Sequence, residues 1–180
     1  MAEREFYSGK VLYPTVVALV SLTALFAFAI MPRFFSKNPL VGREAPDFSL
    51  AVVASGSEGD RIHLSELKGH PVVLDFWATW CEPCQLAAPV LDRLSRKNHD
   101  KGLVVVGVNT SDQPGRAPVF AKRRGLSYPI VYDSDEEVAR LYGVSNLPTL
   151  IVINAEGHIV AVETGYAGES SLEDLVNQAL

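Results

Sequence analysis

The sequence is poor in cysteine, histidine and positive charge, and each shortage excludes a class of function. Two cysteines among 180 residues cannot form a framework of several disulfides. The four histidines stand singly, so they do not complete a metal site with the cysteines, and we expect no metal. The 16 lysines and arginines are outnumbered by 21 aspartates and glutamates, which gives a net charge of -5. Because no basic stripe interleaved with aromatics is present, we expect no nucleic-acid partner.

One long stretch lacks charged side chains altogether. Residues 1–10 form a polar N-terminal tail, whereas residues 11–31 are 21 consecutive uncharged and mostly apolar residues. At about 1.5 Å per residue, a helix of this length matches a bilayer core of about 30 Å. Ala27-Phe-Ala29 also resembles a signal-peptide cleavage pattern, but the apolar run exceeds the usual signal core. We therefore predict a transmembrane anchor over residues 11–31, a tether over 32–43 and one domain over 44–180.

The two cysteines, Cys81 and Cys84, stand together in a Cys-x-x-Cys motif. The apolar run at 72–77 predicts a buried strand before the motif, and residues 82–99 predict a helix after it. Cys81 would then lie at a helix N-terminus, where unpaired N–H groups and the helix dipole favour a thiolate. Cys84, one helical turn further on, can attack a mixed disulfide formed on Cys81. The layout therefore predicts two-step thiol–disulfide exchange, and Pro83 fits the first turn of the helix.

Around this motif the sequence resembles a known family. The segment Asp75-Phe-Trp-Ala-Thr-Trp-Cys-Glu-Pro-Cys84 resembles the active site of thioredoxins, and residues 41–180 resemble the membrane-anchored TlpA/ResA-type branch of the thioredoxin-like proteins. The stretch Gly42-Arg-Glu-Ala-Pro-Asp-Phe-Ser-Leu50 resembles the opening of that branch and of the peroxiredoxins. The resemblance implies an α/β, thioredoxin-like three-layer fold with a central mixed β-sheet flanked by helices, preceded by one N-terminal transmembrane helix. The alternation of predicted strands and helices agrees with this fold.

Asp75 interrupts the apolar strand run six residues before Cys81. Its neighbours on both sides are apolar, so the period-two pattern leaves open whether it is buried or faces solvent. A buried carboxyl would have its pKa raised by desolvation. The resemblance implies the buried alternative, with Asp75 exchanging protons with Cys84 during resolution of the mixed disulfide.

Five further residues are candidates around the cysteines. Trp80 is expected to belong to the substrate-contact surface. Leu147 and Pro148 resemble the cis-proline loop of thioredoxin-like folds, whose backbone would pair with an extended substrate. Glu82 places a negative charge between the cysteines and opposes a thiolate on Cys81. With Pro83 it forms a dipeptide that resembles the ResA-type reductants, although that branch usually carries an acidic residue where this chain has Ala87.

The resemblance implies a membrane-anchored protein-disulfide oxidoreductase that reduces disulfides in extracytoplasmic proteins, with cytochrome c maturation as one setting. Its partners would be a disulfide-containing protein substrate and a membrane thiol electron donor, and no cofactor is expected beyond the cysteine pair. The nearly balanced charges around residues 11–31 do not fix an orientation in the membrane. The placement of the domain on the extracytoplasmic (periplasmic) side is therefore what the resemblance implies. Three alternatives stay open: a dithiol oxidant, a peroxiredoxin-like peroxide reductase and a non-catalytic thiol-protein chaperone.

Overall fold

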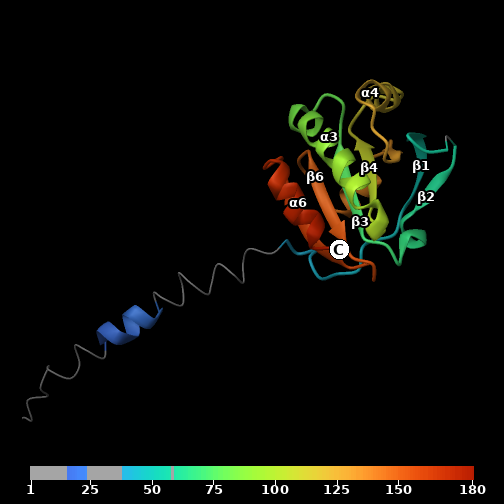
Figure 1. Ribbon diagram of the computed structural model, residues 1–180. Helices are drawn as coiled ribbons and strands as arrows, with labels where there is room; N and C mark the ends of the chain where they lie inside the picture. Colours follow the sequence, from blue (N-terminus) through green and yellow to red (C-terminus); the bar gives the residue numbers. More distant parts are fainter. Residues whose placement is uncertain (1–15, 24–37, 58) are drawn as a thin grey trace, which may run out of the picture. The chain divides into compact units, whose positions relative to one another are not determined.

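The computed structural model describes residues 16–23, 38–57 and 59–180. Leu40–Leu180 form one compact unit built on a seven-stranded sheet in the order β2-β1-β5-β4-β3-β6-β7 (Figure 1). Strand β3 (Val72–Trp77) runs parallel to β4 (Val104–Thr110) and antiparallel to β6 (Thr149–Ile153). The sheet is therefore mixed, as the sequence predicts.

The outer strands complete the sheet on both sides of this centre. β5 (Ile130–Asp133) pairs in parallel with β4. β1 (Ser49–Ala54) pairs antiparallel with β5 and with β2 (Arg61–His63). β7 (Ile159–Thr164) pairs antiparallel with β6 and forms the other edge. The strands that carry the site thus lie in the middle, paired on both sides.

Strand β3 owes its central place to its composition. All six of its residues are buried, which agrees with an apolar run that is covered on both faces of a sheet. Val73 and Trp77 belong to one core cluster, whereas Val72, Leu74 and Phe76 belong to the cluster on the opposite face. The alternation follows from the two-residue period of a strand.

Helices cover both faces of the sheet and give the three layers. One face packs against α3 (Glu82–Lys97), α4 (Arg116–Arg124) and α6 (Glu169–Asn177), and Figure 1 shows α3 and α6 side by side. The other face packs against α5 (Glu137–Leu141) and the 3-10 turn η2 (Leu64–Leu67). A second 3-10 turn, η3 (His99–Lys101), follows α3. The expectation of a thioredoxin-like three-layer fold is confirmed.

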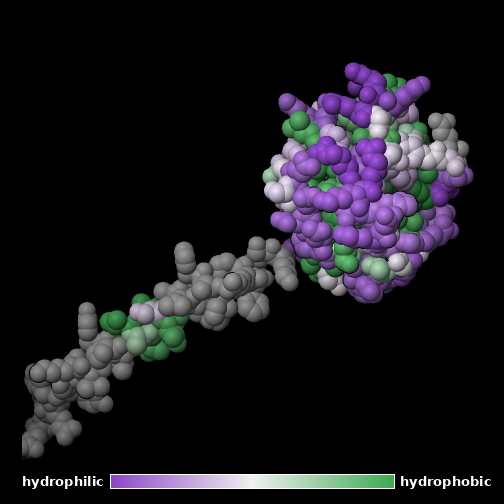
Figure 2. Space-filling model, viewed as in Figure 1, coloured by the Kyte–Doolittle hydropathy of each residue, from purple (hydrophilic) through white to green (hydrophobic). Residues whose placement is uncertain are grey.

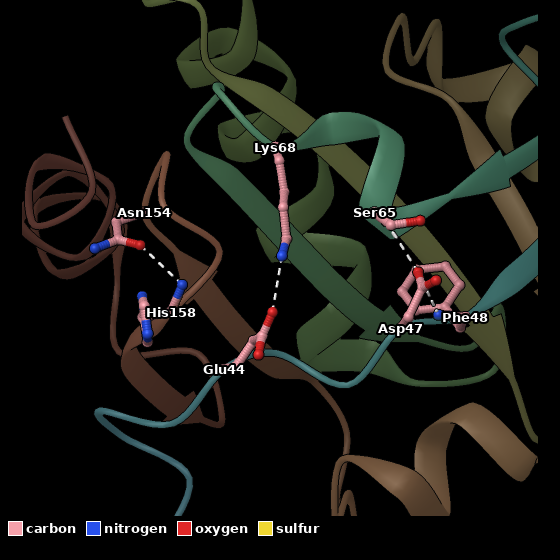
Figure 3. A network of polar contacts seen from close by, with 7 residues as sticks. All are labelled: Glu44, Asp47, Phe48, Ser65, Lys68, Asn154 and His158. Atoms are coloured by element: carbon pink, nitrogen blue, oxygen red, sulfur yellow. Dashed lines mark hydrogen bonds and ion pairs between the residues drawn. The ribbon is translucent and has the colours of Figure 1, made fainter.

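The segment that leads into the domain is held at the end of β3 remote from the cysteines. The Ala45 N–H donates to the Gly157 carbonyl at 2.8 Å, beside the turn that follows β6. Glu44 pairs with Lys68 at 2.8 Å, and the Asp47 carboxylate accepts hydrogen bonds from the backbone N–H groups of Phe48 and Ser65 (Figure 3). In the same view, the His158 N–H donates to the Asn154 side chain. These contacts fix where the predicted tether joins the domain.

The predicted anchor and tether fall largely outside the described residues. Residues 16–23 are helical, and the side chains of Val16, Val17, Leu19, Val20 and Leu22 are exposed. Within the described ranges, no helix has both the length and the apolar character that crossing a bilayer requires.

Candidate active site

The two cysteines are joined in a disulfide at the start of α3. Cys81 is the N-cap residue of that helix, with an extended backbone (φ -80°, ψ 105°), and its sulfur accepts a hydrogen bond from the Cys84 N–H at 3.3 Å. The Cα atoms of the pair are 5.3 Å apart. The sulfur of Cys81 thus occupies the position that a capping oxygen takes in other helices, and a negative charge would be favoured there.

The cysteines differ from their neighbour Trp80 in exposure. Cys81 and Cys84 are 4% and 1% exposed, whereas Trp80 is 61% exposed. The Trp80 indole N–H donates to the Ser111 carbonyl at 2.8 Å, so the ring is held in one orientation at the surface. A partner that reaches the disulfide would therefore meet the Trp80 ring beside it.

The loop before the cysteines is held by Asp112. Its carboxylate accepts hydrogen bonds from the Thr79 N–H at 2.6 Å, the Thr79 hydroxyl at 3.0 Å and the Asn109 side chain at 3.1 Å. Burial raises the pKa of Asp112, but bonds from Thr79, Asn109 and Gln113 outweigh it and leave the pKa below its ordinary value. The position of Asp112 shortly after β4 could have identified it as a site residue. The carboxyl ends of the parallel strands β3 and β4 lie at the same edge of the sheet, where the cysteine loop begins.

Asp75 is buried on the α3 side of the sheet. It shares the strand face of Val73 and Trp77, which pack in the cluster that contains both cysteines, and it is only 1% exposed. Burial raises its pKa from 3.8 to about 7, and the Tyr128 hydroxyl opposes part of that rise. Oδ1 of Asp75 and the Tyr128 hydroxyl are nevertheless both without a hydrogen-bond partner within the described chain. The predicted buried alternative for Asp75 is therefore the one the structure adopts.

Gly107 and Tyr128 shape the surroundings of Asp75, and neither was predicted from the sequence. Gly107 is the partner of Asp75 in the β3–β4 register. A Cβ atom on Gly107 would come within 3.0 Å of the Tyr128 ring and 3.1 Å of the Trp77 indole nitrogen. The absent side chain therefore makes room for both rings beside the carboxyl. A glycine inside a valine-rich strand was the available signal, since such glycines mark close approaches.

Pro148 lies in the loop before β6, at the sheet end where β3 leads to the cysteines. The Leu147–Pro148 bond is cis, which confirms the prediction. The Pro148 carbonyl accepts from the Gly165 N–H at 2.8 Å, whereas the Leu147 backbone makes no hydrogen bond within the described residues. The N–H and C=O of Leu147 are thus available at the position the sequence predicts for substrate pairing.

The residues between and after the cysteines lie in the first two turns of α3. Glu82 and Pro83 are exposed in the first turn, where the missing N–H of proline costs nothing. Ala87 is fully buried in the cluster around the cysteines. Asp75, and not position 87, therefore supplies a buried carboxyl on the face of β3 that packs against α3. Among the described residues, no group of three or more His, Cys, Asp or Glu side chains is arranged to hold a metal ion.

Comparison with known proteins agrees with this geometry. Residues 41–162 match the AhpC/TSA family. The thiol-disulfide oxidoreductases ResA of Bacillus subtilis and Geobacillus thermodenitrificans are 37% and 36% identical, over 91% and 84% of this chain and 89% and 85% of theirs. A candidate thiol:disulfide interchange protein DsbE from Chlorobium tepidum superposes with a TM-score of 0.70 at 33% identity, covering 77% of this chain and 96% of that structure. The chain therefore belongs to the AhpC/TSA family of thioredoxin-like proteins and is a protein-disulfide oxidoreductase.

Proposed function

We propose that the protein is a membrane-anchored reductase of disulfides in extracytoplasmic proteins. The observation that carries this proposal is the Cys81–Cys84 disulfide at the N-terminus of α3, with the buried carboxyl of Asp75 on the same side of the sheet. The N-terminus of a helix stabilises the attacking thiolate, and a carboxyl with a pKa near neutrality can take up and return a proton.

The reaction follows from the order of the two sulfurs. In the reduced protein, the Cys81 thiolate attacks one sulfur of the substrate disulfide, and the other substrate sulfur leaves as a thiolate. Cys84 then loses its proton to Asp75 and attacks Cys81, which breaks the mixed disulfide and releases the second substrate thiolate. Two electrons pass to the substrate, and the Cys81–Cys84 disulfide seen in the structure is regenerated.

Substrate contact is assigned to the surface around the disulfide. The exposed Trp80 ring would support an apolar part of the substrate. The unpaired backbone of Leu147 would add the substrate as a short extended strand. Glu82, exposed between the cysteines, would destabilise a thiolate on Cys81. A less stable thiolate shifts the equilibrium of the cysteine pair toward the disulfide, so the dithiol gives up its electrons more readily. This supports the reducing direction.

The membrane assignment rests on the N-terminal sequence and on the resemblance. Residues 11–31 carry no charged side chain, and the described residues 16–23 are helical with exposed apolar side chains. The reducing electrons would come from a membrane thiol donor, and maturation of c-type cytochromes is the setting that the ResA-type resemblance implies. We assign residues 1–10 to a tail, 11–31 to the anchor, 32–43 to the tether and 44–180 to the extracytoplasmic domain.

The reduction potential of the cysteine pair tests this function. The full-length protein is equilibrated with glutathione or dithiothreitol buffers, and the ratio of dithiol to disulfide is measured by thiol alkylation. A potential near that of thioredoxin, roughly -270 mV, is expected for a reductant. A potential near that of DsbA, roughly -120 mV, would assign the chain to disulfide insertion and overturn the reducing direction.

A further inference from the structure

A groove of about 480 Å³ lies beside the cysteine pair. Thr79 and Gln85 form its wall on the active-site side, and helix α4 with the loop before it forms the other wall. Thr79 stands two residues before Cys81, and Gln85 directly follows Cys84. The Gln85 side chain donates to the Thr79 carbonyl at 2.8 Å, so this wall is fixed to the cysteine motif. A molecule in the groove would therefore contact residues that flank the cysteine motif on both sides.

Helix α4 brings an unpaired positive charge to this groove. Arg116, Arg123 and Arg124 line it, and Lys122 is exposed beside them. Within the described residues none of the four forms an ion pair, and the first turn of α4 contains no acidic residue. Figure 2 shows hydrophilic side chains gathered over α4 at the top of the view. Since the whole chain carries a net charge of -5, this basic surface is a local feature.

Four basic residues elsewhere in the domain are neutralised within the chain. Lys68, Arg93, Arg96 and Lys97 each pair with a carboxylate of the same chain. Among the described basic side chains that line the groove, Arg124 contacts Gln85 at 3.3 Å and the centre of the Phe120 ring at 5.5 Å. Arginines held without a carboxylate, next to a reacting centre, are suited to receive carboxylates from another molecule.

Apolar side chains are exposed around the same groove. Trp80, Leu86 and Val119 are 61%, 57% and 59% exposed. They are three of the five large hydrophobic residues that are exposed in Leu40–Leu180. Trp80 stands between Thr79 and Cys81, Leu86 follows Gln85, and Val119 lines the groove itself. The surface thus offers apolar contact and positive charge together, which is typical of a protein-binding surface.

We propose that this groove binds an acidic, partly apolar segment of the protein whose disulfide Cys81 attacks. The proposal rests on the function proposed above and names the chemistry of its substrate. Carboxylates of the segment would pair with Arg116 and Arg123, while apolar side chains next to its disulfide would contact Trp80 and Val119. Complementary charge of this kind raises the rate of encounter and selects among partners.

Matched disulfide peptides test the proposal on the full-length protein in a non-ionic detergent. The peptides share one cysteine-containing core and carry either three glutamates or three glutamines beside it. For the wild type we expect kcat/KM to be about tenfold higher for the glutamate peptide than for the glutamine peptide. The ratio of the two kcat/KM values should fall toward one as the salt concentration is raised. In an Arg116→Gln/Arg123→Gln variant the ratio should fall to about one. Arg124 is left unchanged because it contacts Gln85 and Phe120.

A control variant separates the groove from total charge. Lys101 and Arg43 are exposed basic residues away from the groove and make no side-chain ion pair in the described part of the chain. A Lys101→Gln/Arg43→Gln variant has the same net charge as the groove variant and should keep the wild-type ratio. Equal rates for both peptides in the wild type, or a ratio that survives in the groove variant, would overturn the proposal.

A binding measurement keeps the proposal independent of catalysis. Serine replaces cysteine in both peptides, and binding to the oxidised protein is followed by tryptophan fluorescence, to which the exposed Trp80 contributes. The glutamate peptide should bind the wild type about tenfold more tightly than the groove variant. If neither disulfide peptide is reduced but this difference persists, the proposed reductase function fails and the groove stands. Tighter binding of a single-stranded oligonucleotide than of the glutamate peptide at equal ionic strength would reject a protein segment as the occupant.

Discussion

Gly107 lies directly opposite Asp75 in the parallel pairing of β3 and β4, and its missing side chain leaves space for two rings beside the buried carboxyl. A Cβ at this position would meet the Tyr128 ring at 3.0 Å and the Trp77 indole nitrogen at 3.1 Å. Gly107 and Asp75 thus have linked roles. Gly107 leaves room for the Tyr128 ring, and the hydroxyl of that ring lowers the pKa of Asp75.

Replacing Asp75 by asparagine should slow the resolving step while the fold is kept. Because burial raises the pKa of Asp75 to about 7, the wild-type rate of disulfide reduction should rise as pH increases through 7 and the carboxyl becomes a base. Asparagine cannot accept the Cys84 proton, so we expect a loss on the order of 10²-fold at pH 8 and a flatter profile. Insulin-disulfide reduction from pH 6 to 9 measures both effects.

A second buried carboxyl provides the control for this experiment. Asp133 is 1% exposed and accepts hydrogen bonds from the Val138 and Ala139 N–H groups at the start of α5. Asp133→Asn should keep the wild-type pH dependence. Identical profiles for Asp75→Asn and the wild type would remove Asp75 from the mechanism.

The Asp75→Asn substitution should also stabilise the oxidised protein against unfolding at high pH. In the unfolded chain Asp75 loses its proton near its ordinary value of 3.8, but in the fold it keeps the proton until about pH 7. The stability that this retained proton contributes is fully present below pH 4 and is lost as pH rises to 7. The loss corresponds to roughly 4 kcal/mol. Urea unfolding should therefore show Asp75→Asn more stable than the wild type at pH 8, with the difference vanishing at pH 4.

Removing the Tyr128 hydroxyl should move the kinetic midpoint to higher pH. The hydroxyl lowers the pKa of Asp75, and burial keeps its own pKa well above its ordinary value, so it stays protonated near neutrality. In Tyr128→Phe the pKa of Asp75 should rise above about 7, and the pH–rate profile should shift in the same direction. Tyr142→Phe, which removes a buried hydroxyl on the opposite face of the sheet, should leave the midpoint in place. A midpoint unchanged in Tyr128→Phe would exclude this coupling.

The cysteine site could be predicted from the sequence because its signals are local. The apolar run of β3, the Cys-x-x-Cys spacing and Pro83 fall within thirteen residues and indicate a strand, a helix start and a reactive sulfur at Cys81. The cis bond before Pro148 was also predicted, by its motif. Each of these features depends mainly on the residues next to it in the chain.

The surroundings of the site could not be predicted because they depend on distant pairings. Which face Asp75 takes is set by the helices that pack on β3, and its apolar neighbours carry no information about that. Tyr128, which precedes β5 in the chain, lies near Asp75 only because β5 pairs with β4, the neighbour of β3 in the sheet. The Thr79–Asp112 contact joins residues 33 positions apart. The sequence predicts that β3 and β4 end at the same edge of the sheet. It does not predict which side chain after β4 contacts Thr79 in the loop before the cysteines.

Single cysteine variants should separate the attacking sulfur from the resolving one. Cys81 caps α3 and is the more exposed of the two, at 4% against 1% for Cys84. Cys84→Ser should therefore accumulate a mixed disulfide with a substrate protein, since nothing resolves the bond on Cys81. Cys81→Ser should accumulate little. Non-reducing electrophoresis followed by mass spectrometry of the adduct distinguishes the two, and trapping by Cys81→Ser alone would reverse the assignment of roles.

Adding one methyl group at Gly107 should destabilise the domain through the packing behind Asp75. The Cβ of Gly107→Ala would approach Tyr128, Trp77 and Ile130 at 3.0, 3.1 and 3.3 Å, and overpacking of this kind costs about 1 to 3 kcal/mol. At Gly56 a Cβ would meet a single carbon closer than 3.4 Å, on Val52, so Gly56→Ala should cost less in the same urea titration. The cost of Gly107→Ala should also shrink in a Tyr128→Ala background, because the nearest ring is then gone. Equal costs in both backgrounds would show that Tyr128 is not what requires glycine at position 107.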